Sequence, residues 1–347
     1  MKRFVSDAIV VIGLLALLAA LLAGRRALGL AGSNGGFLAF TVQGTLLETA
    51  FQHPPASSAW AFGGSAPRGL RYSTWSPGRL AVGVDNRSHR RFYGYFAVTR
   101  STVPANAFVQ AIVEPMDVTT RKGEQAETVV AVQTAWTKQT GLINYLVASN
   151  ISSGGGHQYL LAGYAHGYLR EARTESLWLH HRRLVLPRRK AYLVTIRTDG
   201  YHTADFWING TQIVAARNLH LNIRPPFQVY LEVQAAHMRY AARFTWMAAF
   251  RSAVAKLQGL PADAKVTFRA SGLVLRATAD ARGVAALSFP APELHAQGAL
   301  TISAPDGAAW HWPAFALAGG DVLQFRGLPA WLAWLRYVPA APWLPAR

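Results

Sequence analysis

Three consecutive segments joined by turn dipeptides constrain the fold of this chain more than any other feature. Residues 192–197 lead to Asp199-Gly200, residues 201–208 lead to Asn209-Gly210, and residues 211–216 follow. Asp-Gly and Asn-Gly readily adopt the positive φ angles of two-residue hairpin turns. The pattern predicts a meander of three antiparallel strands in the middle of the chain.

A second pattern, an alternation of period two, marks residues 236–246. Alternate side chains of a strand point to opposite faces, so the apolar set is expected in the core, with Arg239 and Arg243 on the other face. The apolar set is Met238, Tyr240, Ala242, Phe244 and Trp246.

Short runs rich in Val, Ile, Tyr, Phe and Trp recur from about residue 79, separated by turn signals, as an all-β sandwich requires. We predict further strands at 79–84, 92–99, 107–114, 127–136, 141–149, 157–164, 227–235, 266–270, 273–278, 284–289 and 300–303. Between the two groups, 248–257 is expected to be a short connector, with a helix as one alternative. The expected fold class is all-β: an antiparallel jelly-roll sandwich, then a small immunoglobulin- or transthyretin-like β-sandwich, with one N-terminal hydrophobic helix.

Composition supports a folded chain with a substantial core. Hydrophobic residues make up 51% of the 347 residues and charged residues 15%, which is too apolar for a disordered protein. The chain has no cysteine, which excludes disulfides, thiolate zinc sites and Cys nucleophiles.

The N-terminus carries an apolar run of membrane-targeting type. Lys2 and Arg3 precede the uncharged residues 8–24, and Arg25-Arg26 follow them. The length suits either a short membrane span or a signal peptide, and the two arginines disfavour cleavage. We expect an uncleaved signal anchor in the cell membrane, single-pass, with the bulk of the chain extracytoplasmic. The alternative is a cleaved signal peptide and a secreted protein.

These features give five expected segments. They are a signal anchor or signal peptide at 1–26, a stalk with the first strands at 27–77, a jelly roll at 78–250 that starts near residue 40, a small β-sandwich at 256–325, and a tail rich in Trp and Pro at 326–347.

Two stretches resemble known families. With AYLVTIRTDGYHTADFWINGTQIVAAR at 191–217, the region 40–250 resembles the concanavalin A-like lectin/glucanase superfamily, which includes laminin-G-like modules. Through LPADAKVTF, ATADARGVAAL and ISAPDG, the region 259–325 resembles carboxypeptidase-regulatory-like surface modules. The first resemblance implies a jelly roll and a glycan as the class of ligand.

Carboxylates in the pattern of that superfamily's enzymes are missing. Many of its glucanases carry Glu-x-Asp-x-Glu on one strand, which places the carboxylates on one face. This chain offers only pairs spaced by three, such as Glu124 and Glu127, which face apart on a strand. Glu232, within an apolar strand, is the acid expected to be partly buried, and we include it as a candidate ligand-binding residue. No catalytic residue is predicted, although a second acid paired with Glu232 in a deep groove would overturn this.

Metal and cofactor sites are not predicted either. His180 and His181 are adjacent and so face apart on a strand. Asp205 and Asn209 lie near hairpin turns, where a calcium site is one alternative and turn formation the preferred interpretation. The chain has no phosphate-binding loop and no G-x-S-x-G motif.

A basic cluster and exposed aromatic rings are the remaining candidates for binding. The net charge is +18, which favours anionic polymers as partners. The cluster could bind phosphate, sulfate or uronate through its guanidinium groups, with a solvated loop as the alternative. It comprises Arg182, Arg183, Arg188, Arg189 and Lys190. Tyr201 and Trp207 could stack on sugar rings, with core packing as the alternative.

The sequence therefore predicts a membrane-anchored extracytoplasmic binding or structural protein that recognises a glycan or an anionic cell-envelope polymer. An enzyme is disfavoured. The alternatives are a glycoside hydrolase or lyase with a non-standard site, and a self-assembling surface subunit. Nucleic acid is not an expected partner, and no cofactor is expected.

Overall fold

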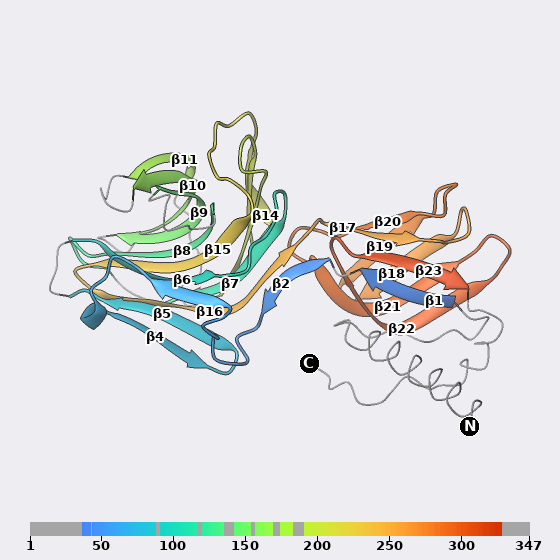
Figure 1. Cartoon of the computed structure of the whole chain (residues 1–347), viewed down its shortest axis with the longest axis horizontal. Coiled ribbons are helices and arrows are strands. Elements are labelled where there is room, and N and C mark those ends of the chain that lie inside the picture. The colour runs from blue at the N-terminus through green and yellow to red at the C-terminus, as the bar shows by residue number, and fades with distance from the viewer. Residues whose placement is uncertain are drawn as a thin grey trace, which may run out of the picture. The chain divides into compact units, whose positions relative to one another are not determined.

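The computed structural model shows a protein built of β-strands (Figure 1). It describes residues 37–42, 44–87, 91–116, 120–134, 142–153, 157–168, 174–182 and 191–327, and the side chains of 44–87, 91–116, 120–134 and 191–326. Across these residues the one helical element is a single 3-10 turn, η1 (Arg68–Leu70), so the all-β fold class is confirmed. None of the described helices could span a membrane, and the expected anchor at 1–26 lies outside the described residues.

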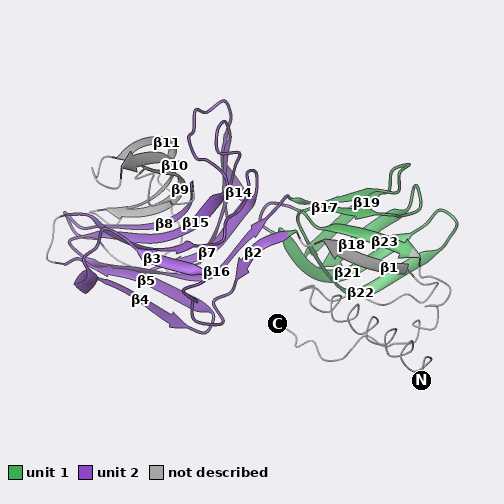
Figure 2. Ribbon diagram, in the orientation of Figure 1, with its two compact units in different colours: residues 1–44, 253–289, 293–347 green, residues 45–252, 290–292 purple. Residues whose placement is uncertain are grey.

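The chain divides into two compact units, coloured separately in Figure 2. The larger comprises 45–252 with 290–292, and the smaller comprises 1–44, 253–289 and 293–347.

The larger unit is a sandwich of two antiparallel sheets. The eight-stranded sheet has the order β14-β13-β12-β7-β16-β5-β4, with β2 also paired to β16. Its strands are β2 (Thr45–Thr49), β4 (Arg71–Ser76), β5 (Arg79–Asp85), β7 (Phe108–Pro115), β12 (Tyr192–Thr198), β13 (Ala204–Ile208), β14 (Thr211–Ala216) and β16 (Arg239–Phe250).

The seven-stranded sheet has the order β11-β10-β9-β8-β15-β6-β3. Its strands are β3 (Trp60–Gly63), β6 (Tyr93–Thr99), β8 (Gln125–Thr134), β9 (Leu142–Ser153), β10 (His157–Tyr168), β11 (Thr174–Arg182) and β15 (Phe227–Ala236).

Strand β15 shows how the core of the larger unit forms. Its residues alternate between buried and half-buried, because one face of the sheet packs on the other sheet. The buried set is Phe227, Val229, Leu231 and Val233, and the half-buried set on the outer face is Gln228, Tyr230, Glu232 and Gln234.

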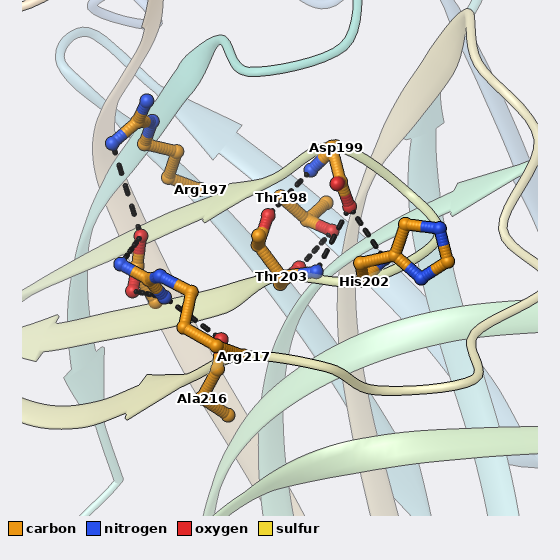
Figure 3. Close-up of polar contacts among 8 residues, drawn as sticks. Arg197, Thr198, Asp199, His202, Thr203, Ala216 and Arg217 are labelled. Carbon is orange, nitrogen blue, oxygen red and sulfur yellow. Dashed lines mark hydrogen bonds and ion pairs between the residues drawn. The ribbon is translucent and has the colours of Figure 1, made fainter.

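The predicted meander is confirmed, with one change. Strands β12, β13 and β14 pair in order, and Asn209 (φ 48°) with Gly210 (φ 80°) forms the expected two-residue turn. The link at Asp199 is a longer loop, so β13 begins at Ala204 rather than at 201. One Asp199 carboxylate oxygen accepts hydrogen bonds from the backbone N–H groups of 201, 202 and 203, at 2.8–2.9 Å, and Figure 3 shows those from 202 and 203. These bonds lower the pKa of Asp199 against the opposing effect of its partial burial and hold the loop in place of a strand.

Strand β16 confirms the predicted alternation as far as Phe244. A bulge between Phe244 and Trp246 shifts the register, so Trp246 is only half-buried and Met247 is fully buried in its place. Most of the expected connector at 248–257 lies in β-strands, because β16 continues to Phe250 and β17 begins at Val254. The helical alternative is therefore wrong.

The smaller unit consists of two four-stranded sheets, with orders β1-β23-β17-β20 and β19-β18-β21-β22. Its strands are β1 (Phe37–Val42), β17 (Val254–Gln258), β18 (Lys265–Ala270), β19 (Leu273–Thr278), β20 (Ala285–Ser288), β21 (His295–Ser303), β22 (Ala309–Ala318) and β23 (Val322–Gly327). Strand β1, from the segment expected to hold a stalk and the first strands, pairs with β23 in this unit.

Buried Asp321 binds the backbone at Gly44, just after β1 in the smaller unit. Its two carboxylate oxygens accept hydrogen bonds from the backbone N–H groups of Gly44 at 2.5 Å and Ala318 at 2.7 Å. The following residues, from Thr45, belong to the larger unit.

Candidate functional site

Two glutamates lie on the outer face of the seven-stranded sheet. On β15, Glu232 is opposite Val129 of β8, and Gln234 is opposite Glu127. Residues directly opposite in an antiparallel pair share a face, and diagonal neighbours are about 7 Å apart. Glu127 and Glu232 are therefore diagonal neighbours on one face, although they are distant in sequence.

The environment of Glu232 favours its protonated form. Glu232 is half-buried, and Glu127 is 9% exposed. Burial first, and then the negative charge of Glu127, raises the pKa of Glu232 to about 8, against a hydrogen bond from Gln234 that works in the opposite direction. At neutral pH the Glu232 carboxyl group therefore holds a proton that it can donate.

Glycine at position 94 makes room for this carboxyl group. Gly94 of β6 is opposite Gln234, and a Cβ atom at position 94 would lie 2.1 Å from Oε1 of Glu232. The Gly94 N–H donates a hydrogen bond to Ser65 Oγ at 2.9 Å. The Glu232 side chain thus lies directly over the backbone of β6.

An aromatic pair adjoins the carboxylates on the same face. Phe96 is opposite Glu232, and its ring centroid lies 4.3 Å from that of Tyr230. Tyr230 also packs against Val129 and Ala131, which form an apolar cluster separate from the main core. The face therefore combines apolar ring surface with two carboxyl groups.

This arrangement suits acid–base chemistry on a glycosidic bond. Such hydrolysis uses two carboxyl groups, one protonated and one ionised, about 5–5.5 Å apart when the stereochemistry is retained and about 6.5–9.5 Å apart when it is inverted. The register makes Glu127 and Glu232 diagonal neighbours on adjacent strands, whose backbone positions are about 7–8 Å apart.

Of the residues selected from the sequence, Glu232 is the one that joins the pair. Tyr201 is 44% exposed in the loop before β13, with its ring centroid 6.4 Å from that of His202. Trp207 is half-buried on β13, with its ring centroid 5.8 Å from that of Phe108. Neither belongs to the sheet that carries Glu232, so the structure does not gather them into one site.

The basic cluster is not placed by the structure. Arg182 is the last residue of β11, and its side chain lies outside the described ones. Arg183, Arg188, Arg189 and Lys190 lie outside the described residues, so an anion-binding role for the cluster stays a prediction.

The calcium alternative at Asp205 is not supported. Arg217 binds the Asp205 carboxylate through two hydrogen bonds of 2.5 and 3.2 Å, and Arg197 lies 3.8 Å away on the other side (Figure 3). Asn209 Oδ1 accepts the backbone N–H of Leu193 at 2.9 Å. These polar groups stabilise the meander, and the side chains that the structure describes include no cluster of three metal-binding residues.

Sequence reasoning missed Glu127 because it considered pairs within a strand. The available signal was a single acid within each of two apolar segments, 125–134 and 227–236. Only the pairing of β8 with β15 brings the two acids together.

Comparisons with solved structures identify similar folds among glycan-acting enzymes. A glycoside hydrolase family 16 endo-glucanase from Bacteroides ovatus shares 8% identity and a TM-score of 0.44, over 59% of this chain and 100% of that one. β-Agarase A in complex with oligoagarose shares 9% identity and a TM-score of 0.46, over 62% of this chain and 94% of that one. The κ-carrageenase from Pseudoalteromonas carrageenovora shares 8% identity and a TM-score of 0.42, over 63% of this chain and 97% of that one. No family model matches the sequence, and no curated protein does.

Two expectations about function need correction. The chain was expected to be a binding or structural protein, and an enzyme was disfavoured, whereas the similar structures are glycoside hydrolases. A second acid, Glu127, lies on the same face as Glu232, which meets one part of the condition set above; the other part is a deep groove around the pair. At 8–9% identity the likeness is one of fold, so the carboxylate pair carries the argument for a reaction.

Proposed function

We propose that the larger unit is a glycoside hydrolase that works through Glu232 and Glu127. The observation that carries this proposal is the strand register that puts Glu127 and Glu232 on one face, where burial and the charge of Glu127 raise the pKa of Glu232. Glu232 would donate its proton to the oxygen of the leaving sugar as the glycosidic bond breaks. Glu127 would act as the ionised partner, either attacking the sugar carbon or activating a water molecule.

Replacing each glutamate by glutamine tests the proposal. Glu232→Gln and Glu127→Gln should each lower the release of reducing ends by about 10²–10⁴-fold, the usual contribution of a general acid or base. Glu114→Gln is the matched control, because Glu114 lies on the eight-stranded sheet, 3.4 Å from Arg243. Full activity in Glu232→Gln, measured over a panel of polysaccharides, would show that this pair is not the catalytic one.

The coupling between the two carboxyl groups is tested separately from activity. Since the charge of Glu127 contributes to the raised pKa of Glu232, Glu127→Gln should lower the pKa of Glu232. Titration of carbon-13-labelled glutamate carboxyl groups by NMR measures this in a folded, inactive protein. An unchanged pKa would mean that the two groups do not interact.

The proposal places the hydrolase on the outer side of a membrane. The apolar run at 8–24 between basic residues supports a signal anchor, and the β-rich remainder suits export. Protease treatment of intact cells should remove the larger unit, and deletion of 1–26 should release the protein from the membrane fraction. If the protease leaves it intact in intact cells and digests it only after lysis, the protein is intracellular.

The smaller unit is proposed to be a carboxypeptidase-regulatory-like module. The support is its resemblance in sequence at 259–325 and its two four-stranded sheets. Such a unit would act as a spacer or carrier, so its deletion should leave the release of reducing ends from soluble substrate unchanged, provided that the larger unit folds alone.

A further inference from the structure

The seven-stranded sheet is depleted of cations in a chain that is otherwise strongly basic. The chain has 35 Lys and Arg against 17 Asp and Glu. Strands β3, β6, β8 and β15, whose side chains are described, contain no Lys, Arg or His. Strands β9 and β10 contain no Lys or Arg, and the first appears as Arg182, the last residue of β11.

The other sheet of the same sandwich shows that this depletion is local. Strands of the eight-stranded sheet carry five arginines, namely Arg71, Arg79, Arg197, Arg239 and Arg243. Arg239 and Arg243 are exposed on its outer face. Arginines therefore occur on the strands of one sheet of the larger unit and are absent from β3, β6, β8 and β15, the described strands around the carboxyl pair.

Amide and aromatic groups lie around the carboxyl pair instead. Gln228 is half-buried on the outer face of β15, and Gln234 binds Glu232. Amides donate and accept hydrogen bonds, as the hydroxyl groups of a neutral sugar require. The ring pair Phe96 and Tyr230 offers an apolar surface for the C–H face of a sugar ring.

Anionic sugars need different partners. Sulfate and uronate groups are recognised through bidentate guanidinium contacts or ammonium charges, which the six strands β3, β6, β8, β9, β10 and β15 do not supply. The charge of Glu127 would also repel an anion placed next to the pair.

We infer that the substrate of the Glu127–Glu232 site is an uncharged polysaccharide, and that acidic polysaccharides bind to other, cationic surfaces without being cleaved. This inference rests on the proposed glycoside hydrolase function. The net charge of +18 attracts acidic polysaccharides to the protein surface, whereas the site itself recognises an uncharged one. Attraction to exposed cations is screened over about 10 Å at 0.1 M ionic strength, whereas contacts to a neutral sugar depend little on salt.

The test uses the full chain and matched pairs of polymers. Neutral glucans, galactans, mannans and xylans are each assayed beside a chemically sulfated form of the same polymer, with binding and release of reducing ends measured at 0.05 and 0.5 M salt. We expect cleavage of a neutral polymer at both salt concentrations and at least about 100-fold slower cleavage of its sulfated form. Binding of the sulfated form should weaken with salt and should be unchanged in Glu232→Gln.

Adding a cation to the face gives a second readout. Gln228→Arg should raise the rate on the sulfated polymer relative to the neutral one by about tenfold, since a charge-assisted contact replaces a neutral one. Gln212→Arg, at an exposed position of β14 on the other sheet, should leave that ratio unchanged.

The possible failures are distinguishable. If the sulfated polymer is cleaved as fast as its neutral parent, and Glu232→Gln abolishes both reactions, the hydrolase stands and the neutral substrate is refuted. If no polymer is cleaved, or if cleavage survives in Glu232→Gln, the proposed function itself is overturned, and this inference with it.

Discussion

Replacing Gly94 by alanine is the sharpest test of the geometry of the site. The added Cβ atom would lie 2.1 Å from Oε1 of Glu232 and 3.2 Å from Cγ of Gln234. Gly94 does not have a positive φ angle, so alanine fits the backbone and the effect is purely steric. The Glu232 carboxyl group must move by about 1 Å or more to reach an ordinary contact distance.

The structure predicts different sizes for the effects on stability and on activity. Overpacking a well-packed site costs about 1–3 kcal/mol, and the lower end applies here because the atom that must move is the end of a half-buried side chain. Misplacing a reacting group by about 1 Å can cost about 10²-fold in rate. Gly94→Ala should therefore fold, with a loss of about 1 kcal/mol, and lose most of its activity.

Gly69→Ala is the matched control for this variant. Gly69 lies in η1 of the same unit, and a Cβ atom there would meet nothing within 4 Å. Urea unfolding gives the stability of each variant, and the release of reducing ends from the polysaccharide that wild type cleaves fastest gives the activity. The expected result is wild-type behaviour for Gly69→Ala and a selective loss of activity for Gly94→Ala.

Two outcomes would refute the reasoning. Wild-type activity in Gly94→Ala, with the pKa of Glu232 unchanged by NMR titration, would mean that the carboxyl group does not lie over β6. An equal loss of activity in both glycine variants would point to a general sensitivity of the unit to substitution, and the carboxyl pair would lose this support.

Three further predictions concern stability. The pKa of Glu232 is raised to about 8 in the folded chain from an ordinary value of 4.5, so the native state binds more protons than the unfolded state between these pH values. The free energy of unfolding should therefore fall as pH rises from about 4.5 to 8, at up to ~1.4 kcal/mol per pH unit. Urea titrations of wild type and Glu232→Gln should show this pH dependence in wild type alone. Arg217→Ala leaves Asp205, which is 2% exposed, with only Arg197 at 3.8 Å, and should lower the free energy of unfolding by about 1–3 kcal/mol. Arg87→Ala breaks an exposed ion pair and should lower it by less than about 1 kcal/mol. Similar losses in the two variants would contradict the role of burial. Gly210→Ala forces a residue with a Cβ into φ 80° and should lower the thermal midpoint by an amount that corresponds to about 1–2 kcal/mol, and an unchanged midpoint would contradict the strain.

Much of the fold could be predicted from local sequence, because strands and tight turns leave local signals. The Asn209-Gly210 turn and the alternation up to Phe244 needed only a few neighbouring residues. The errors arose where side-chain hydrogen bonds or the register of a neighbouring strand decide. Asp199 accepts hydrogen bonds from three backbone N–H groups, which hold residues 201–203 in a loop. The bulge before Trp246 depends on the register between β16 and β7.

The partner of β1 could not be predicted from local sequence either. Residues 37–42 pair with 322–327, at the other end of the chain, and no pattern within 27–77 carries that information. Composition can suggest a stalk, but only the partner strand decides which unit a segment joins.

The carboxyl pair shows most clearly what local spacing cannot provide. The rule that acids three apart on a strand face apart does not apply to Glu124 and Glu127, because Glu124 lies before β8 and accepts a hydrogen bond from the backbone N–H of Arg121. The same rule says nothing about Glu232, which meets Glu127 only through the antiparallel register of β8 with β15. The sequence shows one acid within each of the two strands, a residue type with low sheet-forming propensity. Whether the charge of Glu127 raises the pKa of Glu232 depends on which strands are neighbours, and that depends on the whole sandwich.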